Sequence, residues 1–194
     1  MNILPLLSVE KACYEMKRGI YKPAVPLPRF SRGAADQTRE EREMKWFFGT
    51  DDTWQNLIIR ITLGGVMFPH GAMKLFGWFG GPGVSGTIAM FSKFWHVPVI
   101  LTLLVIAAES LGAIGLIMGF LTRLCALGIF CDMIGAIYLV HWQYGFFMNW
   151  FGTQKGEGFE YHLLVIGMAL ALMITGAGKW SVDRLIARKS GGTQ

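Results

Sequence analysis

Residues 54–75 read WQNLIIRITLGGVMFPHGAMKL, and this stretch decides the fold. It is long enough to cross a bilayer as a helix, which takes ~20 predominantly apolar residues. Three further apolar runs follow at residues 98–121, 124–147 and 161–176, the last of them shorter. Because backbone polar groups in lipid must be satisfied internally, each run is expected to be a helix. The sequence therefore predicts an all-α integral membrane protein built as a four-helix bundle.

The composition supports a membrane protein and argues against several other classes. Hydrophobic residues make up 53% of the 194 residues and charged residues only 16%, whereas a soluble domain carries roughly 25% charged residues. That balance excludes a disordered chain and argues against an ordinary soluble enzyme. The basic residues lie at the chain ends and between apolar runs, so nucleic acid is not an expected partner. Cys13, Cys125 and Cys131 form no CxxC pair, which disfavours a dithiol relay.

Residues 1–53 form an N-terminal extension of a different character. They hold nine Lys or Arg and eight Asp or Glu, and three prolines within residues 23–28 disfavour a continuous helix. We expect this cytoplasmic arm to lie in extended form along a membrane or redox partner subunit. Its expected apolar anchors are Ile3, Leu6, Leu7 and Tyr21. Residues 54–178 then form the membrane domain, and residues 179–194 form a cytoplasmic tail.

The basic residues near the ends of the predicted spans indicate the orientation in the membrane. Eight of them fall on one side: Arg39, Arg42, Lys45, Arg123, Lys179, Arg184, Arg188 and Lys189. Three fall on the other side or at its border: Lys74, Lys93 and Lys155. Because cytoplasmic segments carry the excess of Lys and Arg, we expect both termini in the cytoplasm. The predicted location is the bacterial inner membrane, crossed several times.

Ionisable side chains inside the predicted spans are the candidate functional residues. Each costs about 2.5–3.5 kcal/mol to insert unless it is paired or wetted. The rise along a helix gathers most of them in the outer half of the membrane. This outer group is His70, Lys74, Glu109, His141 and Glu160, and it includes His162 if the helix begins between Glu160 and His162. A purely structural role is the alternative for each of them, as an interfacial hydrogen bond, a snorkelling lysine or a charge at a helix N-terminus.

Two carboxyl groups need particular partners. Glu109 lies deep in its span and is expected to be protonated or to pair with Arg60 or Lys74. Asp132 lies about 180° from His141 on an ideal helix. We therefore expect Asp132 to serve helix packing or a subunit contact, or to pair with Arg60, and to stay apart from the outer group.

A series of motifs runs through residues 54–184 in a defined order. It comprises Arg60-Ile-Thr-Leu-Gly64, His70-Gly-Ala-Met-Lys74-Leu-Phe-Gly77, Gly80-Gly-Pro-Gly83, Glu109, Gly119-Phe-Leu-Thr-Arg123, His141, Gly145-Phe-Phe147, Glu160 and Gly176-Ala-Gly-Lys-Trp-Ser-Val-Asp183. This order and spacing resemble the DoxX family of four-helix bacterial membrane proteins. The family is described as oxidoreductases, and its relatives include the membrane subunit of thiosulfate:quinone oxidoreductase. The N-terminal extension, Asp132 and His162 depart from the family pattern.

Two function classes remain open. In the first, the chain is a membrane subunit linked to the quinone pool, with a quinone as a non-covalent cofactor and a partner subunit as the electron donor. The candidate catalytic residues are His70, Glu109 and His141, and the candidate quinone-binding residues are Lys74, Glu160 and Arg60. A metal site built from His70, His141, His162 and a carboxylate is a weaker alternative, because the sequence has neither an HExxH motif nor a close His pair on one helix face. In the second class, the chain is a non-catalytic structural subunit of a larger membrane complex.

Overall fold

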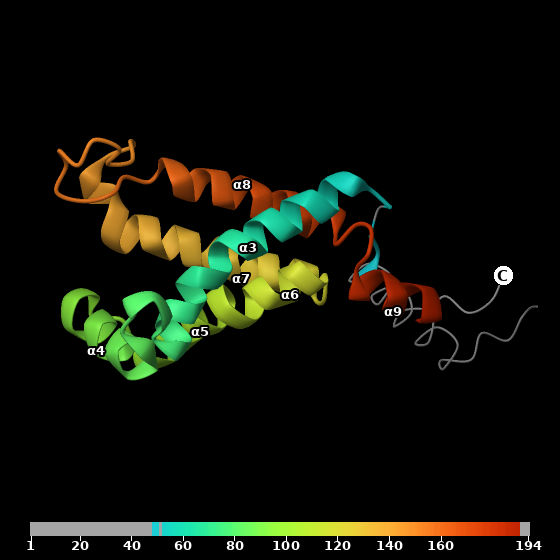
Figure 1. The fold of residues 1–194 in the computed structure, drawn as a ribbon, viewed down its shortest axis with the longest axis horizontal. Helices are drawn as coiled ribbons and strands as arrows, with labels where there is room; N and C mark the ends of the chain where they lie inside the picture. The colour runs from blue at the N-terminus through green and yellow to red at the C-terminus, as the bar shows by residue number, and fades with distance from the viewer. Residues whose placement is uncertain (1–47, 51, 191–194) are drawn as a thin grey trace, which may run out of the picture. The chain divides into compact units, whose positions relative to one another are not determined.

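The computed structural model describes residues 48–50 and 52–190, and every regular element within them is helical (Figure 1). In chain order these are α3 (Trp54–Phe76), η1 (Trp78–Gly80), α4 (Gly83–Trp95), α5 (Val99–Ala107), η2 (Ala108–Gly112), α6 (Ala113–Met118), α7 (Thr122–Ala136), η3 (Ile137–His141), η4 (Trp142–Tyr144), α8 (Glu160–Thr175) and α9 (Val182–Ser190). The predicted helical class is confirmed for this part of the chain. The predicted arm and its anchors Ile3, Leu6, Leu7 and Tyr21 lie outside the described residues.

Two continuous helical segments are long and apolar enough to cross a membrane. Val99–Met118 joins α5, η2 and α6, and Thr122–Tyr144 joins α7, η3 and η4. Each contains one π-helical turn, η2 in the first and η3 in the second. The i→i+5 hydrogen bonds of a π-helical turn put more residues into each turn of the helix. They therefore change which residues lie on the same face. The helix α8 is apolar but shorter.

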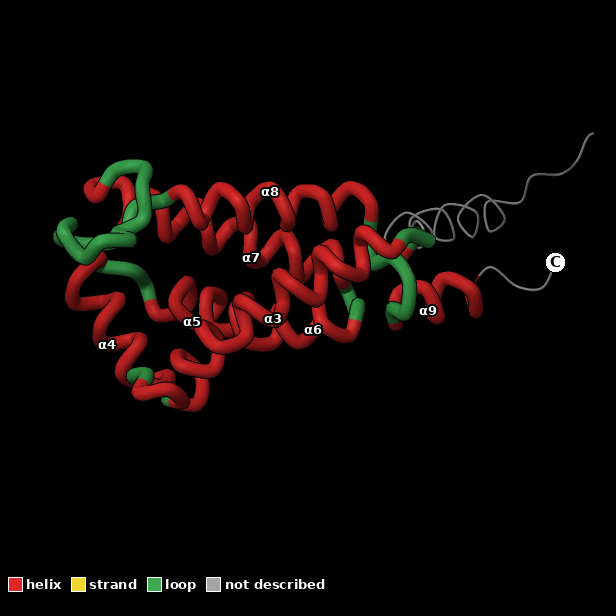
Figure 2. Tube along the Cα trace, turned by 45° about the horizontal axis from the view of Figure 1, so that its top comes forward, coloured by secondary structure: helices red, strands yellow, loops and turns green. Residues whose placement is uncertain are grey.

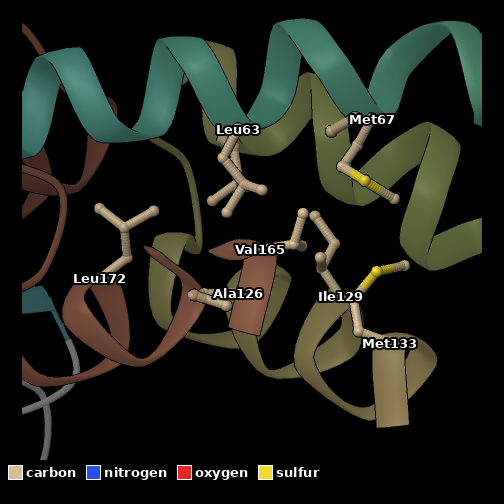
Figure 3. Packing of buried hydrophobic residues seen from close by; sticks show 10 residues of the cluster. Leu63, Met67, Ala126, Ile129, Met133, Val165 and Leu172 are labelled. Atoms are coloured by element: carbon tan, nitrogen blue, oxygen red, sulfur yellow. The ribbon is translucent and has the colours of Figure 1, made fainter. Parts of the chain in front are cut away.

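The long helices bury one another in pairs. Helix α3 packs along α6 and η2, and α7 packs along α8, as the tube in Figure 2 shows. Their contact is made by a cluster of buried apolar side chains (Figure 3), namely Leu63, Met67, Ala113, Leu116, Ala126, Ile129, Met133, Val165, Ala169 and Leu172. Burying a Leu or Met side chain stabilises the fold by about 1.5–3 kcal/mol, so this cluster fixes how the helices pack.

Glycines allow α3 to approach the second segment closely. A Cβ atom on Gly64 would lie 2.7 Å from the carbonyl oxygen of Ala113. A Cβ atom on Gly71 would overlap the backbone of Glu109. Small residues let helix backbones approach in this way inside membranes. The close approach at Gly71 brings Lys74, one turn further along α3, beside Glu109.

Buried polar groups fasten the helices at the connection between α6 and α7. Arg60 donates from its guanidinium to the carbonyl oxygens of Leu116, Ile117, Ala177, Lys179 and Trp180. Asp183 accepts hydrogen bonds from the backbone N–H groups of Leu121 at 2.8 Å and Thr122 at 2.9 Å, at the start of α7. Gly119 ends α6 in the left-handed conformation, with φ of 65°. These contacts join α3 to the ends of two helices and to the segment before α9.

The outer surface of the apolar helices is itself apolar. Ile100, Leu104 and Leu111 on the first long segment are each more than half exposed, at 64%, 58% and 64%. On α8, Leu164 and Ile174 are exposed to a similar degree. Contiguous exposed apolar side chains of this kind mark a surface that faces lipid or another protein.

Candidate functional site

One cavity of about 950 Å³ lies among α3, α4, α5, η2, α7, η3 and α8. Its polar lining consists of His70, Lys74, His96, Glu109, Asp132, His141, Glu157, Tyr161 and His162. Its apolar lining includes Met90, Phe91, Trp95, Leu101, Leu104, Val105, Leu139 and Val140. The cavity therefore brings together His70, Lys74, Glu109 and His141, which the sequence places in the outer group.

Lys74 and Glu109 form an ion pair at the cavity wall. The Lys74 ammonium contacts the Glu109 carboxylate, and the two side chains are 19% and 7% exposed. The position of Glu109 depends on the π-helical turn η2, which carries it, and on Gly71, which lets α3 lie against that turn. Of the two partners that the sequence allows for Glu109, the structure selects Lys74. Buried charges are tolerated when they are paired in this way.

Asp132 joins this pair, which corrects the expectation that it lies apart from the outer group. Its carboxyl lines the cavity and is within hydrogen-bonding reach of Glu109, while its Oδ2 is buried without a hydrogen-bond partner. The prediction was wrong because it assumed an ideal helix between Asp132 and His141. The π-helical turn η3 lies between them and winds through fewer degrees per residue, so both side chains reach the same cavity. The suggested pairing of Asp132 with Arg60 is absent, since Arg60 is occupied by backbone carbonyls.

Imidazole rings from α3, η3 and α8 line the same cavity. The rings of His141 and His162 lie 4.1 Å apart between centroids, and His70 is near enough to act electrostatically on His162. Nδ1 of His141 lies 2.8 Å from the carbonyl oxygen of Glu157. Because a carbonyl only accepts, this nitrogen carries the proton and a neutral His141 keeps its lone pair on Nε2. Nδ1 of His162 is buried and has no hydrogen-bond partner.

Two residues of the predicted quinone-binding set lie elsewhere. Arg60 is 1% exposed, and its guanidinium N–H groups donate to backbone carbonyls at the α6–α7 connection. Glu160 accepts a hydrogen bond from Nε1 of Trp150 at 2.9 Å and does not line the cavity. His162, two residues further along α8, lines it instead, as the spacing of these two residues implies for a single cavity.

Several cavity residues were missed by the sequence analysis. Tyr161 lines the cavity and its hydroxyl is buried without a partner. His96 directly follows α4, has a left-handed backbone conformation with φ of 54°, and also lines the cavity. Cys131, the neighbour of Asp132, also lines it. One sequence signal could have pointed to Cys131 and Asp132. It is a helical wheel drawn through residues 131 and 132, provided that the wheel allows for one π-helical turn.

The described part of the chain contains no group of three or more His, Cys, Asp or Glu side chains arranged to hold a metal ion. The cluster instead offers ring nitrogens, carboxyl oxygens, one ammonium and one phenol. These groups can donate hydrogen bonds to a ligand oxygen and exchange protons with it.

Comparison with known families gives one match. The model of the DoxX family matches residues 56–142, which run from the first turn of α3 to the first residue of η4 and so contain His70, Lys74, Glu109, Asp132 and His141. Neither the curated proteins nor the solved structures contain a match to this chain. The matching family and the two long apolar helices together indicate a membrane protein.

Proposed function

We propose that this chain, which belongs to the DoxX family through residues 56–142, is an integral membrane subunit that binds a quinone and is linked through it to the quinone pool. The observation that carries the proposal is the cavity of about 950 Å³, which is apolar along α4, α5 and η3 and polar around Lys74 and Glu109. Ligand pockets are mostly apolar with a few convergent polar groups, and this cavity has that form.

Four helical segments span the membrane in this proposal: α3, Val99–Met118, Thr122–Tyr144 and α8. The exposed apolar side chains of α8 and of the two long segments support this arrangement. Arg123, Lys179 and Arg184 lie near the α6–α7 connection and the start of α9, away from the cavity. That end is cytoplasmic by the excess of basic residues, so the polar part of the cavity lies toward the periplasm of a bacterial inner membrane.

The lining of the cavity fits a quinone in two respects. A quinone ring and its isoprenoid tail need apolar walls, which Leu101, Leu104 and Val105 supply from α5. The two carbonyl oxygens of the ring need hydrogen-bond donors. His70 can donate through a ring nitrogen, and His141 can donate through Nε2 when its ring is protonated. Lys74 keeps further N–H groups beside the one that engages Glu109. We expect no covalent attachment.

Reduction of a quinone to a quinol consumes two electrons and two protons. The electrons come from a redox centre in a partner subunit, and this chain contributes the proton-exchanging groups His70, Glu109 and His141. Each lies at the cavity wall. Groups positioned for proton transfer typically accelerate a reaction by about 10²–10⁴-fold.

Titration of the purified protein with decylubiquinone tests the proposal. We expect saturable binding to the wild type, and loss of binding or of quinone-linked activity in His70→Ala and Glu109→Gln while both variants stay folded. Tyr138→Phe is a matched control, because Tyr138 is 81% exposed and lies outside the cavity lining. Absence of saturable binding to the wild type in lipid nanodiscs would contradict the proposal.

A non-catalytic role in a larger membrane complex is the second candidate function. The Arg60 network favours it, because it shows that a buried charge in this protein can serve the fold alone. Under this alternative, His70→Ala and Glu109→Gln lower the yield of folded protein or of the intact complex. Purification from the native membrane then returns a fixed set of subunits with no bound quinone.

A further inference from the structure

The contact between Asp132 and Glu109 needs a physical explanation. Oδ2 of Asp132 is buried without a hydrogen-bond partner, yet its carboxyl is within hydrogen-bonding reach of the Glu109 carboxyl. Two ionised carboxylates in contact repel each other, and the contact becomes favourable when one proton lies between their oxygens. A proton shared between the two carboxyl groups removes this repulsion and accounts for their proximity.

Lys74 sets the charge of this group. Its ammonium contacts Glu109, so Lys74, Glu109 and Asp132 are neutral together when the two carboxyl groups hold one proton. Among the described residues that line the cavity, Lys74 is the one Lys or Arg. A second ionised carboxylate would be left without a counter-charge at a largely buried position, which is costly. The other titratable groups that line the cavity are His70 on α3, His96 after α4, Cys131 on α7, His141 on η3, Glu157 before α8, and Tyr161 and His162 on α8.

His162 is an independent sign that a ligand belongs in this cavity. The residue is 6% exposed, lines the cavity, and has a ring nitrogen, Nδ1, without a hydrogen-bond partner. Buried polar atoms in native proteins are almost always hydrogen-bonded to protein or water. An unpartnered nitrogen on the wall of a cavity is therefore available to a polar atom of a bound molecule.

We propose that Glu109 and Asp132 share one proton and that this carboxyl pair exchanges that proton with an oxygen of a ligand in the cavity, whose wall also carries His162. The inference rests on the proposed quinone site and adds the group that moves the proton there. When a one-electron carrier of a partner subunit is oxidised and the quinone ring is reduced, the O–H bond of the carboxyl pair breaks. A new O–H bond forms at the ring oxygen, and the pair remains as two carboxylates beside Lys74.

Infrared spectroscopy tests the shared proton on the full chain without any ligand. A protonated carboxyl has a C=O stretching band that carboxylates lack, and this band shifts in heavy water. We expect the band in the wild type and its loss in both Asp132→Asn and Glu109→Gln, since each variant leaves one carboxylate to pair with Lys74. Asp52→Asn, which alters an exposed partner of Arg184, should keep the band. A wild type without the band, or a band kept in either single variant, would overturn the shared proton.

Decylubiquinone then tests the exchange and separates it from the quinone site itself. We expect bound quinone to shift the carboxyl band of the wild type, and Asp132→Asn to bind quinone about fivefold more weakly, as for one lost hydrogen bond. Binding without any shift of the band would overturn the exchange while leaving the quinone site standing. Absence of binding to the wild type would overturn both the quinone site and the exchange. The carboxyl band of the ligand-free wild type and its shift in heavy water would still test whether the proton is shared.

Discussion

Arg60 and Lys74 lie on the same helix, α3, but they differ in their hydrogen-bonding partners. Arg60 is buried, and its guanidinium donates to five backbone carbonyl oxygens. Lys74 has one carboxylate partner and borders a cavity in which Asp132 and His162 carry polar atoms without partners. A buried charge whose bonding capacity is filled by the backbone holds the fold together. A polar cluster that is left incomplete beside a cavity can serve a ligand.

The two surroundings also differ in what they connect. Arg60 joins α3 to the end of α6 and to residues 177–180, which are far apart in the sequence. The cluster around Lys74 connects α3, η2 and α7 through their side chains. Variants at the first site should therefore affect stability, and variants at the second should affect binding.

The largest effect is expected for Arg60→Met. The change removes the buried cation and leaves five carbonyl oxygens short of a donor, so we expect a loss of about 3–5 kcal/mol in the free energy of unfolding. Thermal or denaturant unfolding in detergent measures it. The matched control is Arg184→Met, which breaks a partly exposed pair with Asp52 and should cost about 0–1 kcal/mol. Equal losses in the two variants would contradict a structural role particular to Arg60.

A smaller loss is expected for Gly71→Ala. The added methyl group would overlap the backbone of Glu109 and push α3 away from η2, at a cost of about 1–3 kcal/mol. It should also weaken quinone binding, because Lys74 and Glu109 would separate. Gly65→Ala is the control on the same helix, since nothing lies within 4 Å of its added Cβ. That variant should gain up to about 1 kcal/mol from better helix propensity, and a loss there would undermine the comparison.

Asp183→Asn should cost about 1–2 kcal/mol in unfolding free energy. The carboxylate uses one oxygen for the N–H of Leu121 and the other for the N–H of Thr122, and an amide offers only one acceptor oxygen. Quinone affinity should not change, because this carboxylate lies outside the cavity lining. A clear fall in quinone affinity without any loss of stability would show that the α6–α7 connection and the cavity are coupled.

The smallest effect is expected for Tyr161→Phe. Its hydroxyl is buried without a partner, so removing it should raise the free energy of unfolding of the ligand-free protein by up to about 1 kcal/mol. Tyr138→Phe, at an exposed tyrosine, should leave stability unchanged. A destabilised Tyr161→Phe would mean that the hydroxyl already has a structural partner.

The sequence was sufficient to predict the helical class and most of the outer group. Apolar runs of near-spanning length marked the positions of α3 and the two long segments, and ionisable residues within them marked His70, Lys74, Glu109 and His141. Helical rise alone estimates depth in a membrane, because every residue adds the same distance along the axis. Position along the helix axis was therefore enough to expect these four side chains near one another, and they line one cavity.

Direction around the helix axis was the part that sequence alone could not supply. The two π-helical turns carry Glu109 and His141, and no residue type marks such a turn in advance. A single wide turn at η3 was enough to move Asp132 to the same cavity as His141. Arg60 was misplaced for a different reason, because a buried guanidinium pairs as readily with backbone carbonyls as with a carboxylate, and the sequence does not show which is near.

Photolabelling with an azido-quinone reports where a quinone binds without requiring an electron donor. We expect label on peptides that line the cavity, from α5, α7 and α8, and we expect excess decylubiquinone to prevent labelling. Label should persist at reduced occupancy in Asp132→Asn and should be normal in Asp183→Asn once that variant is folded. Label spread over the lipid-facing surface without competition, or concentrated beside Arg60, would contradict the assignment of the cavity as the quinone site.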